Sequence, residues 1–324
     1  MNLSRTPVRL AAFLLGLAAV FALALGLGRW AGPFDVAAAE HDTAAAHGTD
    51  DAGDGGPGDV TGHGAGDAAH PEEPGEAAPA PAGLLAAQDG YTLTVESPVL
   101  SAGRADLAFT VTGPDGRPVT AYDVVHEKRL HLIVVRRDLA GYQHLHPELD
   151  DDGRWRTTAR LLPGSWRLIA DFTPSAGDSG VVLGTDLTVP GRFDPAPPTS
   201  SADAGRTVEV DGYAVTLDGA LAAGGESSLR FTVTRAGVPV TDLEPHLGAL
   251  GHLVALGEAD LGYSHVHPLT GGGTRPGEIA FAVETPTPGP RRLFLEFRHR
   301  GAVHTAEFAV DTVDAPHEEE PHGH

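Results

Sequence analysis

Three histidines recur with the same spacing in two parts of this chain. The segment "HLIVVRRDLAGYQHLHP" covers residues 131–147 and "HLVALGEADLGYSHVHP" covers residues 252–268, so both follow the pattern H-x12-H-x-H-P. Neutral imidazole nitrogens bind Cu(II), Zn(II) and Ni(II), and three of them make a reasonable set of ligands for one such ion. The repeated pattern therefore predicts metal binding.

Composition narrows the choice of ligands. The chain has 17 histidines, no cysteine, and Met1 as its one methionine. Disulfides, thiolate metal sites and thioether ligation of Cu(I) are excluded, which leaves imidazole and carboxylate groups. The expected ion is copper(II) or zinc. Because neutral imidazole is required, binding should weaken as the pH falls through about 6.5, the ordinary pKa of histidine.

The net charge argues against nucleic acid as a partner. It is −22 at neutral pH, and no stripe of lysine and arginine is present to attract a phosphate backbone. No Ser-His-Asp, phosphate-loop or paired-carboxylate arrangement stands out either. With nucleic acid excluded, we expect the metal ion itself as a partner. A protein that delivers the metal is a second expected partner, which the sequence does not identify.

Strand geometry explains how the three histidines of one repeat could meet. "HLIVV" is rich in β-branched residues and predicts a strand, and "YQHLHP" predicts its antiparallel return. If His131 stands opposite His146, then Ile133 stands opposite His144, and all three imidazoles share one face. His252, His265 and His267 satisfy the same relation. Whether the two groups form separate sites or one shared site is left open.

A fourth ligand is sought just before each strand. His126 and His246 are the candidates, although their positions relative to the strand histidine differ by one residue. The competing interpretation is structural: His131 alternates with apolar residues and would then point inward and bond to a backbone carbonyl. The candidate metal ligands are His126, His131, His144, His146, His246, His252, His265 and His267. His299 and His304 are not assigned to a site.

The elements around these segments predict an all-β fold. Short runs such as "ADLAFTVT" and "SSLRFTVTR" alternate apolar and polar residues and are separated by Gly/Pro/Asp turns. Because the pattern restarts in the second half, we expect two tandem Ig-like or cupredoxin-like β-sandwiches. Their expected ranges are 84–190 and 207–312, with a Pro-rich linker over 191–206 and a His/Glu-rich tail over 313–324.

The N-terminal segment predicts export. Arg5 and Arg9 precede an uncharged apolar run over 10–28, which as a helix spans about 28 Å. We expect a signal-anchor transmembrane helix over 10–30, with 1–9 in the cytoplasm and the bulk of the chain outside. A cleaved signal peptide, giving a secreted protein, is the alternative. The acidic, His-containing segment 31–83 has few large apolar residues and predicts a disordered linker.

The segment "DGRPVTAYDVVHEKRLHLIVVRRDLAGYQHLHPELDDDGRW", residues 115–155, resembles secreted or anchored bacterial proteins with YtkA-like and CopC-like β-sandwich domains. The resemblance covers about residues 90–175 and, more faintly, 212–310. It implies copper or heavy-metal handling outside the cytoplasm.

The main functional hypothesis is a non-catalytic, membrane-anchored, extracytoplasmic protein that binds copper(II) or zinc in metal homeostasis or sequestration. One alternative is a structural or adhesive surface β-sandwich protein without metal. A second is a metal-dependent oxidoreductase, because "HLHPE" and "SHVHP" resemble the H-x-H motifs of cupins and of Cu/Zn superoxide dismutases. Metal titration with an activity assay separates the three.

Overall fold

The structure is a computed structural model, and it describes residues 81–177, 179–197, 205–269 and 275–313. The predicted signal anchor, most of the predicted linker and the tail from residue 314 lie outside these residues. Every regular element in the described part is a β-strand, which confirms the all-β fold class for that part. It contains no helix that has the length and apolar character to cross a membrane.

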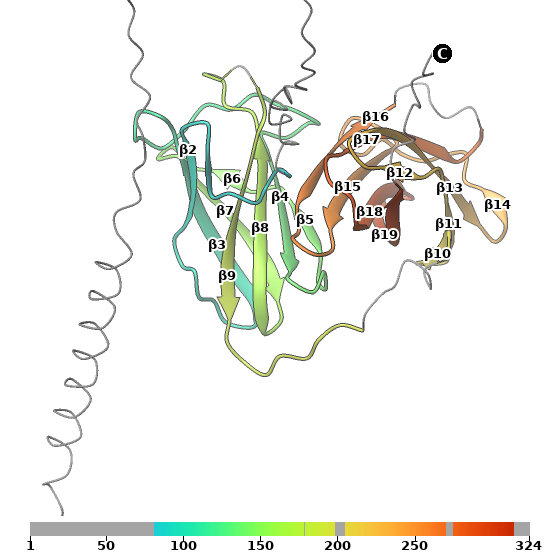
Figure 1. Ribbon diagram of the computed structural model, residues 1–324, viewed down its shortest axis with the longest axis horizontal. Helices are drawn as coiled ribbons and strands as arrows, with labels where there is room; N and C mark the ends of the chain where they lie inside the picture. The colour runs from blue at the N-terminus through green and yellow to red at the C-terminus, as the bar shows by residue number, and fades with distance from the viewer. Residues whose placement is uncertain (1–80, 178, 198–204, 270–274, 314–324) are drawn as a thin grey trace, which may run out of the picture. The chain divides into compact units, whose positions relative to one another are not determined.

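The first repeat is a sandwich of two antiparallel sheets (Figure 1). One sheet has the strand order β1-β2-β3-β7-β6, and the other has the order β5-β4-β8-β9. The strands are β1 (Ala87–Gln88), β2 (Tyr91–Val95), β3 (Gly103–Thr112), β4 (Leu130–Arg136), β5 (Gln143–Leu145), β6 (Glu148–Leu149), β7 (Arg154–Leu161), β8 (Gly164–Phe172) and β9 (Val181–Val189).

The second repeat has the same arrangement, except that one strand joins its two sheets. The order is β10-β11-β13-β17-β16-β15-β18-β19-β12, with β14 paired to β13. The strands are β10 (Thr207–Val210), β11 (Tyr213–Asp218), β12 (Leu221–Ala222), β13 (Gly225–Arg235), β14 (Val238–Pro239), β15 (Gly251–Gly257), β16 (Tyr263–Pro268), β17 (Glu278–Thr285), β18 (Pro290–His299) and β19 (Ala302–Val313).

Each repeat has its own apolar core, formed by one face of each sheet. In the first, Phe109 stacks near Trp155, whose Nε1 donates to the hydroxyl of Tyr122 at 3.2 Å. In the second, Phe231 packs against Phe281. Inward and outward residues alternate along the strands, because side chains of a strand point to opposite faces. The period-2 pattern in the sequence therefore predicted these strands correctly.

A third apolar cluster lies between the repeats and is built from equivalent positions of both. Ile133 and Val135 on β4 belong to it, as do their counterparts Val254 and Leu256 on β15. These residues point away from the sandwich cores, so β4 and β15 are buried on both faces. Strands that read as continuous apolar runs are typical of such two-sided burial. The two repeats thus share an apolar interface.

An aromatic pair holds the same interface. The ring of Tyr142, from the first repeat, lies 3.8 Å from the ring of Phe294 at an angle of 4°. Ile169 on β8 is the counterpart of Phe294 on β18 and also belongs to the cluster. A stacked aromatic pair contributes about 0.5–1.5 kcal/mol beyond the apolar area that it buries.

The last residues of the predicted linker also bind both repeats. The nitrogen of Tyr263 donates to the carbonyl of Ala82 at 2.9 Å, and the nitrogen of Gly83 donates to Val182 at 3.2 Å. Gly184 permits this close approach, because a Cβ atom there would lie 1.9 Å from the carbonyl oxygen of Gly83. Ala82 and Gly83, which the sequence assigned to the linker, are therefore hydrogen-bonded to the two repeats.

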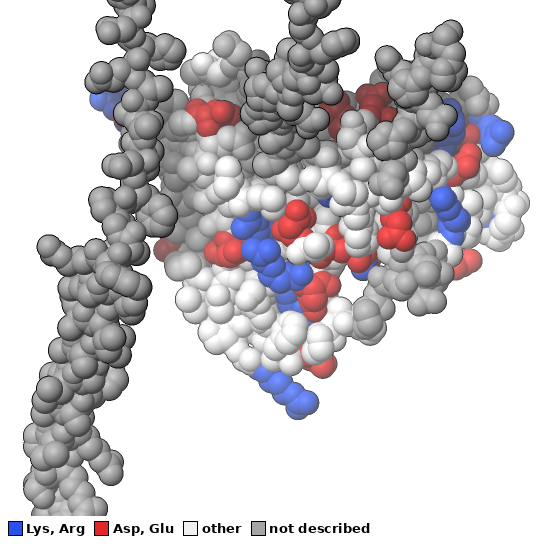
Figure 2. All heavy atoms as spheres, in the orientation of Figure 1, with Lys and Arg blue, Asp and Glu red and all other residues white. Residues whose placement is uncertain are grey.

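Surface charges of both signs are interspersed on the face in Figure 2, where basic and acidic side chains lie next to one another. Ion pairs between exposed groups, such as Arg137 with Asp186 at 2.9 Å, are of this kind. On that face no broad basic surface is present.

Candidate metal centre

The centre of the candidate site is a direct contact between two imidazoles of the first repeat. Nδ1 of His131 lies 3.0 Å from Nε2 of His144. The other nitrogen of His131 lies 3.1 Å from the carbonyl oxygen of Val125, and it must donate because a carbonyl only accepts. Likewise, Nδ1 of His144 donates to the carboxylate of Glu296 at 2.9 Å. In the neutral imidazoles, both facing nitrogens therefore carry lone pairs.

Two lone pairs at this distance need a positive charge beside them. A proton held between the rings, or a metal ion in front of them, meets this need. Donation from the second ring nitrogen to a carboxylate or a backbone carbonyl is also what fixes the tautomer of metal-binding histidines. The hydrogen bonds around His131 and His144 thus have the arrangement expected of two metal ligands.

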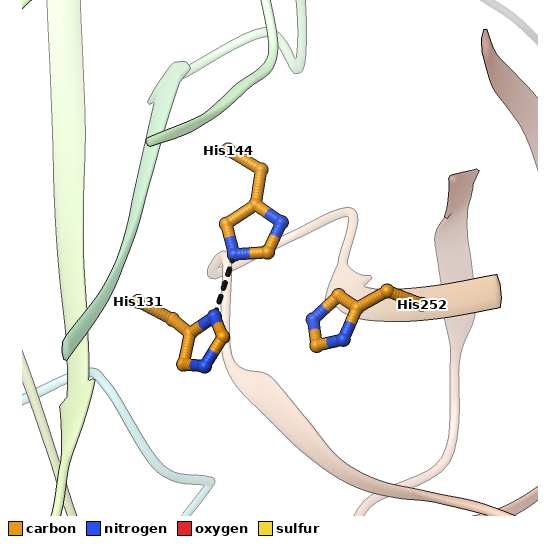
Figure 3. A group of neighbouring side chains, drawn as sticks. All are labelled: His131, His144 and His252. Carbon is orange, nitrogen blue, oxygen red and sulfur yellow. Dashed lines mark hydrogen bonds between the residues drawn. The ribbon is translucent and has the colours of Figure 1, made fainter. Parts of the chain in front are cut away.

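The third imidazole comes from the second repeat. The ring of His252 lies over those of His131 and His144, with centroids 5.4 Å and 4.7 Å away. Figure 3 shows the three rings turned toward one another from two separate parts of the chain. One nitrogen of each lies within 4.8 Å of the others. Zinc with Zn–N bonds of about 2.0–2.1 Å holds tetrahedral ligands roughly 3.4 Å apart, so an ion would draw the rings together.

A fourth nitrogen beside this group has no partner. The ring centroid of His146 lies 4.7 Å from that of His144 and 5.2 Å from that of His131. Its Nε2 atom is buried and forms no hydrogen bond. A buried polar atom left unsatisfied costs about 1–3 kcal/mol, which coordination of an ion would remove. The donor set therefore fits a metal that accepts three or four imidazoles. We name His131, His144, His146 and His252 the inner cluster.

Burial keeps the imidazoles of His131, His146 and His252 neutral. It lowers the pKa of His131 to about 4, with a further contribution from the neighbouring His144. In the same way burial lowers the pKa of His146 to about 3, and it places the pKa of His252 well below the ordinary value. Neutral imidazole is the form that binds metal. Proton competition therefore begins at a more acidic pH than the value of about 6.5 expected from the sequence.

A carboxylate stands opposite each strand histidine. Asp171 pairs with His131 between β4 and β8, and Glu296 pairs with His252 between β15 and β18. Burial raises the pKa of Glu296, but hydrogen bonds from His144 and another histidine outweigh it and hold the pKa below its ordinary range. Glu296 is therefore ionised, and it stabilises the tautomer of His144 that faces the inner cluster.

Sequence reasoning missed both carboxylates, although a signal for them exists. When the repeats are aligned, "LIADF" over 168–172 matches "LFLEF" over 293–297, and an acidic residue interrupts the apolar run at the same position. An acidic residue in a buried strand is rarely left unpaired. Its recurrence in both repeats would have pointed to a partner for each strand histidine.

The turns before β4 and β15 explain why the two fourth-ligand candidates differ in register. In the first repeat Val125 closes a two-residue turn made by His126 and Glu127, whose φ angles are 48° and 64°. In the second repeat His246 closes the equivalent turn. His246 therefore corresponds to Val125 and not to His126.

These two candidates contact different parts of the site. The ring of His126 lies 5.9 Å from that of His252 and 6.1 Å from that of His131. Nε2 of His246 instead lies 3.3 Å from the carboxylate of Glu296. His246 thus supports the carboxylate, whereas His126 lies beside the inner cluster.

The predicted hairpin register is confirmed, but it does not produce two equivalent groups. Ile133 stands opposite His144 in the first repeat, as expected. In the second, β16 pairs with β15 only up to Ser264 and then pairs with β17 from His265 onward. His265 and His267 are exposed, with their rings 4.2 Å apart. His252 is consequently grouped with histidines of the first repeat.

His299 and His304 lie in a separate polar group. His299 is buried, and its ring nitrogens lie 2.7 Å from the hydroxyl of Tyr213 and 3.1 Å from Asp242. His304 lies 2.8 Å from Asp211. The two histidines do not stand opposite each other across the hairpin, since His304 pairs with Phe297. These contacts account for both side chains without a metal.

The fold and the cluster together define a tandem β-sandwich protein with histidines gathered between its two repeats. The chain belongs to the family described as "Domain of unknown function (DUF8832)", whose model matches residues 86–189 and 208–314. This match confirms the tandem domains and gives no support to the resemblance to YtkA-like or CopC-like domains. The comparison with curated proteins found no match.

Similar solved structures include an adhesin, an S-layer protein and intimin, as their titles name them. The Escherichia coli adhesin FdeC is 17% identical over 70% of this chain and 65% of its own, with a TM-score of 0.23. S-layer protein SbsC domains 5–6 are 13% identical over 69% and 97% (TM-score 0.22), and intimin D0–D1 is 13% identical over 68% and 97% (TM-score 0.21). None of these titles names a metal. TM-scores this low carry no argument about function.

Proposed function

We propose that the protein binds one divalent transition-metal ion, copper(II) or zinc, in the inner cluster between its two repeats. The observation that carries this proposal is the pair of facing nitrogens on His131 and His144. Their other nitrogens donate to Val125 and Glu296, so both facing atoms present lone pairs at 3.0 Å. His252 supplies a third lone pair from the second repeat.

The role is binding without turnover. His131 and His252 are supplied by the buried strands β4 and β15, which the interface cluster packs together. Rigid ligands of this kind favour retention of the ion over turnover. Homeostasis or sequestration of the metal is the function that follows. The predicted signal anchor supports a location outside the cytoplasm, and the anchored form is part of the proposal.

Metal titration of the full chain with Cu(II) and Zn(II), by calorimetry and equilibrium dialysis, tests this function. His131→Ala and His252→Ala should each abolish the same tight equivalent, because the two residues hold one ion. The double variant should lose no more than either single variant. His304→Ala is the matched control, since its partner is Asp211 and not the inner cluster. Its tight equivalent should be unchanged.

Two results contradict the proposal. If His131→Ala and His252→Ala removed separate equivalents, each repeat would hold its own ion and the shared inner cluster would be wrong. If the wild-type chain bound no ion more tightly than a His131→Ala, His252→Ala double variant, the histidines would be structural. The surface β-sandwich protein without metal would then be the better description. Turnover in an oxidoreductase assay with the loaded protein would favour the third hypothesis.

A further inference from the structure

A cavity of about 250 Å³ opens beside the inner cluster and is lined by histidines of both repeats. The two histidines of the "HLHP" segment do not line it. The histidines in its lining are His126, His131, His252, His265 and His267. The strand histidines His131 and His252, which stack with an interplanar angle of 8°, therefore belong both to this cavity and to the inner cluster.

The cavity also contains the counterpart of the carboxylate that supports the inner cluster. Asp171 lines it and accepts a hydrogen bond from the hydroxyl of Tyr263 at 3.1 Å. Positive charge stabilises a partly buried carboxylate of this kind, and a metal cation supplies such charge.

The stacked rings of His131 and His252 have the inner cluster on one side and the cavity on the other, and the residues of these two sides occupy equivalent positions in the two repeats. His265 and His267 in "SHVHP" occupy the positions of His144 and His146 in "HLHP". Asp171 in "LIADF" occupies the position of Glu296 in "LFLEF". Each side thus has an H-x-H pair from one repeat and a carboxylate from the other.

Exposure distinguishes the two sides. His265 and His267 are exposed, whereas Nε2 of His146 on the other side is buried. Lys128 and Arg129 also line the cavity, and their charges weaken the binding of a cation there. Ligands on this side therefore exchange with water more readily than those of the inner cluster. His126 also lines the cavity, and its ring is 5.9 Å from that of His252.

We propose that His265, His267, His126 and Asp171 form a second, outer metal site, through which a divalent transition-metal ion reaches the inner cluster. This proposal rests on the proposed function. Transfer between the sites is ligand exchange: imidazoles of the outer site leave the ion as those of the inner cluster bind it, with no change of oxidation state. The outer site should be the weaker of the two.

The test compares three full-length variants with the wild-type chain. Zinc bound elsewhere on the chain is the same in all variants and is subtracted. Equilibrium dialysis should then give two bound Zn(II) ions per wild-type chain. His265→Ala combined with His267→Ala should lose the weaker equivalent and keep the tight one. Both side chains are exposed, so circular dichroism should confirm an unchanged fold. His144→Ala should lose the tight equivalent, and the control His304→Ala should lose neither.

Loading kinetics test the entry role. After rapid mixing with Cu(II), the absorption of the copper–imidazole complex in the inner cluster should develop more slowly in the His265→Ala, His267→Ala variant, although its final amplitude is unchanged. Loss of the weaker equivalent with an unchanged loading rate would overturn the entry role. If that variant kept both equivalents while His144→Ala lost one, the outer site would be wrong and the inner site would stand. No loss in either variant would overturn both proposals.

Discussion

Replacing Glu296 by glutamine removes the charge behind the inner cluster and little else. The carboxylate is 7% exposed, and it accepts hydrogen bonds from His144 at 2.9 Å and from His246 at 3.3 Å. A glutamine carbonyl still accepts from Nδ1 of His144, so the tautomer is kept while the negative charge is lost. Mutation of a residue that accepts a hydrogen bond from a metal-binding histidine typically lowers metal affinity by about 10–100-fold, or roughly 1.4–2.7 kcal/mol.

Competition titration against a chelator of known affinity measures this change. We expect Glu296→Gln to raise the dissociation constant of the tight equivalent by about 10–100-fold without changing its stoichiometry. Asp242→Asn is the matched control, because Asp242 also binds a histidine, His299, but outside the cluster. An affinity equal to that of the wild-type chain would refute the reasoning that Glu296 acts on the ion through His144. An equal loss in the control would point to a general electrostatic effect.

Three further predictions concern the fold. Phe294→Ala removes the ring stacked on Tyr142 and should lower the free energy of unfolding by about 3–5 kcal/mol in urea, while exposed Val303→Ala changes it little. In metal-free protein, stability should be complete above pH 6.5 and should fall toward pH 4 by about 3 kcal/mol from His131 alone, because the unfolded chain protonates this histidine first, with further losses from His146 and His252; equal urea midpoints at pH 7 and pH 4.5 would contradict this. Gly184→Ala should cause a large loss of thermal stability, since its Cβ would meet the carbonyl of Gly83.

Local pattern predicted most of the strands but could not predict what covers them. The alternation in "ADLAFTVT" identified β3, and the symmetric hairpin relation identified the pairing of Ile133 with His144. The same reasoning treated each repeat as a separate body. "HLIVV" and "HLVAL" are apolar on both faces, which was the available sign that a second surface covers these strands.

Sequence spacing could not predict which histidines share the candidate site, because this depends on contacts between the two repeats. His252 meets His131 and His144 only because the two repeats pack through β4 and β15. The departure of β16 from β15 after Ser264 is likewise set by its pairing with β17. Spacing along one hairpin therefore identified the right residue types and grouped them by repeat, whereas the fold groups them across the interface.

The equivalence of the two faces in the interface has a consequence for how this chain arose. A surface that contributes the same positions from both partners is the kind that joins two identical subunits. Val135 and its counterpart Leu256 both belong to the interface cluster, so a single repeat carries the apolar residues needed to pair with a second copy of itself. Joining the copies in one polypeptide replaces association in solution by an effective concentration on the order of millimolar. Once joined, each half is free to change alone, and the two halves do differ: one H-x-H pair belongs to the inner cluster, whereas the other is exposed.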